Sequence, residues 1–211
     1  MIITDVKKID SKKSLVCIDY EPAFALYNFE MRRLEIKVNE DISKEVYNGI
    51  LSDILIKRCR ERVGYILGKS DKSVYEIKSK LKQGYYPESV IKDVIEEYLR
   101  YGYLDDERYA FNYVKNNMSR KSVKKIRNEL SMKGISKEVI NKAFMKSEIE
   151  YEAIDDVQFK IIEKEFYKKK YDFKEDDRMI LNKIIASLLR KGFELDDVMR
   201  VYNRMKSKNV C

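Results

Sequence analysis

The chain has 211 residues, of which 44% are hydrophobic and 38% are charged, with only 7 Gly and 2 Pro. This composition is typical of a helix-rich protein that can bury a hydrophobic core. Because the chain has no His, a Ser-His-Asp triad and a His-ligated metal are excluded. Its three widely spaced cysteines fit reduced thiols, and no apolar run is long enough for a membrane span. We therefore expect a cytoplasmic protein without membrane contact.

The formal net charge is +8, and the basic residues are concentrated in two stretches. Residues 57–82 carry nine basic and three acidic side chains, and residues 115–133 carry seven basic side chains and one acidic one. Such stretches form basic surfaces, for which nucleic acid is a common partner. The alternative interpretation is a set of solvated helix faces with no ligand.

The first forty residues differ from the rest of the chain. Residues 14–20 and 23–27 are short, partly alternating apolar runs, which predicts a β-hairpin with Pro22 limited to the turn or to an edge strand. We expect residues 1–42 to form an N-terminal extension. After it the apolar spacing becomes helical, with Ser43 as the first N-cap.

An internal repeat organises the remainder. The sequence that begins at Ser73 recurs 49 residues later from Ser122, and a third copy follows 58 residues further on. A period near 50 with helical spacing indicates stacked helical units. The apolar positions that coincide are Val74, Ile77, Leu81, Tyr86, Val90 and Ile91 in the first copy, Val123, Ile126, Leu130, Ile135, Val139 and Ile140 in the second, and Leu181, Ile184, Leu188, Phe193 and Val198 in the third.

Each copy predicts three helices. Ser73 and Glu76 form a capping-box pattern, the chain turns at Gly84 or Tyr85, and Pro87 lies near the start of the next helix. The fold predicted is therefore mainly α, with about three tandem three-helix repeats and a small segment that contains the β-hairpin. The boundaries expected for the repeats are residues 43–104 with a leading helix, 105–150 and 151–211.

Five segments in this order resemble the RecX family, bacterial regulators of the RecA recombinase. They are Arg58-Cys-Arg-Glu-Arg-Val-Gly-Tyr-Ile-Leu, a Ser73-containing helix that ends in Lys80-Leu-Lys-Gln-Gly-Tyr, Tyr103-Leu-Asp-Asp-Glu-Arg-Tyr-Ala110, Ile126-Arg-Asn-Glu-Leu-Ser-Met-Lys-Gly-Ile135 and Leu188-Leu-Arg-Lys-Gly-Phe193. The string Leu-Asp-Asp-Glu-Arg, followed by an aromatic residue and Ala, is the most specific of them. The resemblance covers residues 57 to 205 approximately.

The resemblance implies an elongated, curved helical body that binds in the groove of a RecA filament on single-stranded DNA and suppresses its ATP hydrolysis and strand exchange. It implies no catalytic activity and no cofactor, and we expect a monomer. The motif residues to which it gives a structural role are Leu104, Asp105, Asp106, Tyr109, Ala110 and Gly134.

The basic faces are the candidate contacts with the partner protein or with DNA. The residues predicted for this role are Arg58, Arg62, Lys72, Lys78, Lys82, Arg120, Lys121, Lys124, Lys125 and Arg127. The alternative function is a helical-repeat protein that binds single-stranded DNA directly, without the recombinase. An enzyme ranks third, because Gly68-Lys-Ser70 lacks the earlier glycine of a phosphate loop, where Val63 stands.

Overall fold

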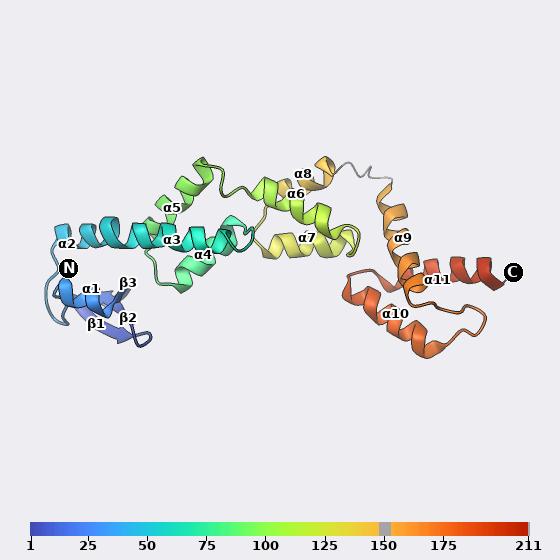
Figure 1. Ribbon diagram of the computed structural model, residues 1–211, viewed down its shortest axis with the longest axis horizontal. Helices are drawn as coiled ribbons and strands as arrows, with labels where there is room; N and C mark the ends of the chain where they lie inside the picture. Colours follow the sequence, from blue (N-terminus) through green and yellow to red (C-terminus); the bar gives the residue numbers. More distant parts are fainter. Residues whose placement is uncertain (148–152, 211) are drawn as a thin grey trace. The chain divides into compact units, whose positions relative to one another are not determined.

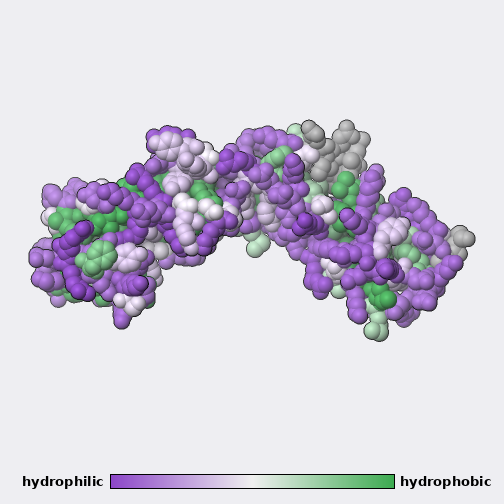
Figure 2. Space-filling view, viewed as in Figure 1, coloured by the Kyte–Doolittle hydropathy of each residue, from purple (hydrophilic) through white to green (hydrophobic). Residues whose placement is uncertain are grey.

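The structure, a computed structural model, describes residues 1–147 and 153–210 (Figure 1). It divides into two compact units, Met1–Asp105 and Asp106–Cys211. Within the described ranges, no helix combines the length and apolar character that a membrane crossing needs. On the face drawn in Figure 2, most side chains are hydrophilic and the hydrophobic ones gather in separate patches.

The first compact unit begins with a three-stranded antiparallel sheet, drawn in blue in Figure 1, whose strands are β1 (Ile3–Lys8), β2 (Lys13–Ile18) and β3 (Glu21–Tyr27). The predicted hairpin is confirmed as β2 and β3, whereas β1 was not expected. The two residues between β2 and β3, Asp19 and Tyr20, have φ of 48° and 70°. Positive φ at both positions is the geometry of a tight type I′ hairpin turn. Pro22 therefore lies on the edge strand β3.

Helices follow the sheet. After α1 (Asn28–Arg33), the chain forms α2 (Lys44–Gly49), a π-helical turn η1 (Ile50–Leu55) and α3 (Ile56–Leu67) without a break. Ser43 caps this helix as predicted, because its Oγ accepts a hydrogen bond of 3.2 Å from the Val46 amide.

The first repeat is completed by α4 (Val74–Gln83) and α5 (Glu88–Arg100). The capping box predicted for α4 is present, since the amides of Ser73 and Glu76 each donate to the other's side chain over 3.1 Å. Pro87 is the N-cap of α5, one position before the place that the sequence indicated. A single core joins Phe24 of the sheet to Leu55 and to the buried faces of α4 and α5.

The second compact unit holds two further three-helix repeats. Repeat 2 consists of α6 (Asp106–Asn117), α7 (Val123–Met132) and α8 (Lys137–Lys146), and repeat 3 consists of α9 (Ala153–Lys168), α10 (Arg178–Arg190) and α11 (Leu195–Val210). Each has its own cluster of buried apolar residues. The predicted alignment of the repeats is confirmed at their centres, where six side chains are fully buried: Ile77, Leu81, Ile126, Leu130, Ile184 and Leu188.

One backbone position is left-handed in every repeat. The residues that follow α4, α7 and α10 at equivalent positions are Tyr85, Gly134 and Gly192, with φ of 58°, 76° and 86°. The turn between the second and third helix of a repeat therefore requires positive φ, which glycine adopts without steric cost. Repeat 1 makes the same turn with a tyrosine.

Candidate partner-binding surfaces

The start of α7 is in contact with the turn between α10 and α11. Ser122 is the N-cap of α7, and its Oγ accepts a hydrogen bond of 3.2 Å from the Lys125 amide. The same hydroxyl donates a hydrogen bond of 2.6 Å to the carbonyl oxygen of Gly192. The Ser122 amide donates a hydrogen bond of 3.0 Å to the carbonyl oxygen of Lys191. The N-terminal end of α7 therefore connects repeat 2 to repeat 3.

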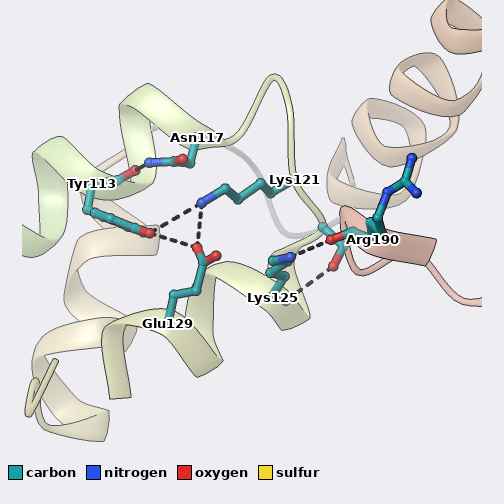
Figure 3. A network of polar contacts seen from close by, with 7 residues as sticks. Tyr113, Asn117, Lys121, Lys125, Glu129 and Arg190 are labelled. Carbon is teal, nitrogen blue, oxygen red and sulfur yellow. Dashed lines mark hydrogen bonds and ion pairs between the residues drawn. The ribbon is translucent and has the colours of Figure 1, made fainter. Parts of the chain in front are cut away.

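Lys121, predicted to contact a partner, lies in a network within repeat 2 (Figure 3). Its Nζ forms an ion pair of 2.7 Å with Glu129, which also accepts a hydrogen bond of 2.7 Å from the Tyr113 hydroxyl. Burial acts to lower the pKa of Lys121, but the hydrogen bonds with Glu129 and Tyr113 outweigh it and the pKa is raised. The charge of Lys121 is therefore largely neutralised by Glu129 inside the repeat.

The next two predicted lysines point towards repeat 3. Lys124 forms an exposed ion pair of 2.6 Å with Glu194, and Lys125 donates a hydrogen bond to the carbonyl oxygen of Arg190 (Figure 3). Gly192 lies so close that a Cβ on it would stand 2.6 Å from the Cβ of Lys125. These lysines support the contact between the two repeats.

Arg127 and Arg120 differ in their surroundings. The guanidinium of Arg127 donates to Asn141 over 2.6 Å and lies 4.5 Å from the ring centroid of Phe144. Arg120 precedes α7, is exposed, and pairs with no carboxylate among the residues that the structure describes. Among the described residues, Arg120, Lys125 and Arg127 form no ion pair with a carboxylate, and of these three Arg120 is the exposed one.

The predicted lysines of repeat 1 are partly neutralised. Lys82 forms an exposed ion pair of 3.0 Å with Glu88, and Lys72 lies 3.9 Å from the Glu76 carboxylate. Lys78 is half-buried on α4. An exposed pair such as that of Lys82 and Glu88 contributes little to stability, so its charges can be exchanged for those of a partner.

A groove in the first compact unit gathers the remaining predicted residues and several that sequence reasoning missed. It has a volume of about 560 Å³ and lies between the sheet and the helices α3 and α4. We name it the basic groove; its lining residues are Lys13, Tyr27, Arg58, Glu61, Arg62, Lys80, Gln83, Gly84 and Tyr86. Lys13 and Lys80 are distant in sequence, so only the fold could reveal that they share a site.

Arg58 is the fixed centre of the basic groove. It forms an ion pair with the buried carboxylate of Glu30 and donates a hydrogen bond of 3.3 Å to the carbonyl of Ala25. Its guanidinium lies 4.5 Å from the Tyr27 ring centroid, and Lys13 Nζ lies 4.7 Å from the same centroid. The Tyr27 ring thus holds two cations in place.

Tyr86 is one of the lining residues of the basic groove. Burial raises the pKa of Tyr86 to about 12, so the hydroxyl stays protonated at neutral pH and can donate a hydrogen bond. Tyr85, its neighbour, is half-exposed and carries the left-handed turn.

The family-motif residues occupy structural positions. Leu104 is buried in the core of the first compact unit, and Ala110 is fully buried in that of repeat 2. Asp105 and Asp106 stand at the start of α6, where carboxylates favour the positive end of a helix. Tyr109 is half-buried and stacks on Tyr113 with ring centroids 6.1 Å apart. Within the part of the chain that the structure describes, no three acidic or Cys side chains gather as a metal site.

Comparison with known proteins agrees with the fold. The family model described as "RecX, second three-helix domain" matches residues 105–143, which include α6 and α7. A protein named Regulatory protein RecX from Clostridium beijerinckii is 27% identical over 206 residues, with 98% of this chain and 95% of the relative covered. Another of that name, from Caldanaerobacter subterraneus subsp. tengcongensis, is 28% identical and covers 96% and 99%.

Solved structures show the same fold. The crystal structure of a regulatory protein RecX aligns with a TM-score of 0.54 at 18% identity, covering 96% of this chain and 98% of the other. RecX from Lactobacillus salivarius aligns with a TM-score of 0.52 at 24% identity, covering 71% and 95%. The resemblance inferred from the sequence motifs is therefore confirmed.

Proposed function

We propose that this chain, a member of the RecX family of regulatory proteins, binds a RecA recombinase filament on single-stranded DNA and inhibits its ATP hydrolysis and strand exchange. The observation that supports the proposal is the similarity to proteins named Regulatory protein RecX over almost the whole chain. Those relatives are named as regulators, which supports a role without catalysis. We propose that the protein acts as a monomer.

Inhibition of this kind requires only that the chain occupies its binding site on the filament. The three repeats have buried cores and leave charged side chains on their surfaces, and the net charge is +8. A basic surface of this kind is attracted to DNA phosphates and to acidic protein faces. A chain that binds across neighbouring recombinase subunits excludes the incoming duplex, or holds the subunits in a state that cannot cycle.

Co-sedimentation tests the binding step. Recombinase filaments are assembled on single-stranded DNA with a slowly hydrolysed ATP analogue, and the chain is added at equal concentrations to filaments, to recombinase alone and to DNA alone. The proposal predicts that the chain pellets with the filament at concentrations where DNA alone retains little of it. Equal retention by DNA with and without recombinase would contradict the proposal.

The basic groove supports a second candidate function, direct binding of single-stranded DNA without the recombinase. Four cationic side chains line it, which suits a phosphate backbone. The signature of this function is tight binding to naked single strands that weakens steeply as salt rises.

A further inference from the structure

We propose that the basic groove of the first compact unit binds the phosphodiester backbone of single-stranded nucleic acid. The inference deepens the proposed function and rests on it for the biological role, because it assigns the DNA contact to residues of β2, α3 and α4. Lys13, Arg62 and Lys80 are the residues that bind the phosphates.

Most of the positive charge in the basic groove is not neutralised by ion pairs. Among the residues that the structure describes, neither Lys13, Arg62 nor Lys80 forms an ion pair with a carboxylate, whereas Arg58 is paired with Glu30. Of the eight predicted basic residues outside the groove, four form ion pairs with carboxylates: Lys72, Lys82, Lys121 and Lys124. The groove therefore concentrates unpaired positive charge in one concave site, where low-dielectric walls focus its field.

The basic groove is arranged before a ligand arrives. The buried pair of Arg58 and Glu30 fixes the Tyr27 ring, and this ring holds Lys13 at its face. A lysine restrained in this way loses less side-chain entropy on binding. Gln83 and the protonated hydroxyl of Tyr86 add polar groups to the lining. The volume of about 560 Å³ falls in the size range of small-ligand sites, which accommodates a nucleotide phosphate and its sugar.

The chemistry of the lining favours a nucleic-acid backbone over an acidic protein segment. Protein interfaces depend on apolar or aromatic anchors that enter pockets. Lys13 and Arg58 lie against the Tyr27 ring, and Tyr86 is more buried than exposed. The groove therefore offers a peptide no free aromatic anchor of this kind. A phosphate backbone needs closely spaced positive charges and no apolar anchor, and contacts of this type are independent of base sequence.

Fluorescence anisotropy with a labelled oligothymidylate tests the inference on the full chain. The Lys13→Gln/Lys80→Gln double variant should bind roughly tenfold more weakly and lower the slope of log affinity against log salt by about 1.4, because each single-strand phosphate contact contributes about 0.7. Lys92→Gln is the matched control, since Lys92 lies on α5 of the same compact unit and outside the groove. It should leave both quantities unchanged.

A second variant changes the charge in the opposite direction. Glu61 is exposed, and it is the one acidic residue among the described residues that line the groove. Its negative charge therefore repels a bound phosphate. Glu61→Gln should strengthen oligothymidylate binding several-fold. A folding defect in the lysine variant cannot produce this gain, so the pair of variants separates a binding role from a structural one. Loss or no change of affinity in Glu61→Gln contradicts the inference.

The other outcomes identify other ligands. If the lysine double variant binds naked DNA like the wild type but no longer pellets with recombinase filaments, the groove binds an acidic protein face and the inference is wrong. If the groove variants behave as expected but the wild type does not inhibit a recombinase, the groove assignment stands and the proposed function fails.

Discussion

The hydroxyl of Ser122 donates a hydrogen bond of 2.6 Å to the carbonyl oxygen of Gly192, while accepting one from the Lys125 amide. One side chain therefore caps α7 and connects repeat 2 to repeat 3. Helical repeats depend on such neighbour contacts, because each buries only a small core of its own. The neighbouring lysines support this contact, which explains why a strongly basic stretch is not simply a binding surface.

Gly192→Ala should weaken the contact between these repeats. The added Cβ would stand 2.6 Å from the Cβ of Lys125 and 2.7 Å from Ser122 Oγ, at a φ of 86° that disfavours alanine. We expect the free energy of unfolding of the second compact unit to fall by about 1–3 kcal/mol, as for other overpacked sites. Urea denaturation followed by circular dichroism measures this change.

Gly49→Ala is the control for that substitution. Gly49 lies in α2 with φ of −60°, and nothing stands within 4 Å of an added Cβ. Alanine there should raise the free energy of unfolding by about 0.5–1 kcal/mol, the difference in helix propensity. If both glycine variants changed stability in the same direction, the close packing at Gly192 would not be the cause.

Tyr85→Gly should stabilise the first compact unit. Tyr85 has φ of 58° at the position where the other two repeats have glycine, and a left-handed conformation costs a tyrosine about 1–2 kcal/mol. Its side chain is 42% exposed, so little packing is lost. After the entropy cost of glycine is subtracted, we expect a net gain of roughly 0.5–1 kcal/mol in thermal or urea unfolding.

The opposite result is expected at a helical tyrosine. Tyr75 is 56% exposed on α4, so Tyr75→Gly should destabilise the same unit through the poor helix propensity of glycine. A loss of stability in both tyrosine variants would show that the Tyr85 side chain contributes more by packing than its backbone costs.

Arg120→Glu should weaken binding to the recombinase filament and leave folding intact. Arg120 is exposed and has no carboxylate partner in the described part of the chain, so the substitution breaks no internal contact. We expect at least a several-fold loss in co-sedimentation with filaments, which fades as salt rises. Lys115→Glu makes the same charge change at an exposed site outside the predicted surface. Equal binding by the wild type and Arg120→Glu would remove Arg120 from the partner surface.

Asp176 makes repeat 3 sensitive to acid. Its carboxylate accepts hydrogen bonds from Lys206, Tyr171 and Tyr202 at 2.6, 2.6 and 2.5 Å, and these hydrogen bonds, that of Lys206 foremost, hold its pKa below the usual value of 3.8. A lowered folded pKa gives stability that is complete above about pH 4 and is lost as the pH falls towards the folded pKa.

Asp176→Asn should therefore flatten the dependence of the urea midpoint on pH between about pH 5 and pH 2. Glu175→Gln is the control, because this neighbouring side chain is exposed and has no ion pair among the described residues. An Asp176→Asn variant that lost stability with acid as steeply as the wild type would rule out this carboxylate as the acid-sensitive group.

Local signals in the sequence predicted most of the helical fold. The caps at Ser43 and Ser73 and the buried Ile and Leu positions depend on neighbours within one helix, so spacing alone reveals them. Strand β1 was missed for the opposite reason. Its sequence, Ile3–Lys8, is rich in polar residues and becomes a strand because it pairs with β2, across a register shift between Ile3 and Asp5.

The candidate surfaces were predicted less completely. The sequence predicted Lys121 and Lys124 as surface contacts, but their partners, Glu129 and Glu194, come from other turns or other repeats. The sequence does not reveal which lysines are neutralised, because ion pairing depends on tertiary contacts. The basic groove also depends on tertiary contacts, because only the folded chain brings Lys13 of the sheet and Lys80 of α4 to one site.

Single-strand-dependent ATP hydrolysis by a RecA recombinase, measured while the chain is titrated in, shows whether the chain acts on the recombinase filament. A parallel titration against naked DNA at the same salt shows how much chain is needed to cover the strand. We expect loss of hydrolysis at substoichiometric ratios, far below those that cover the DNA. Hydrolysis that falls only when the chain saturates naked DNA would contradict this expectation, because the chain would then compete for the strand without acting on the filament.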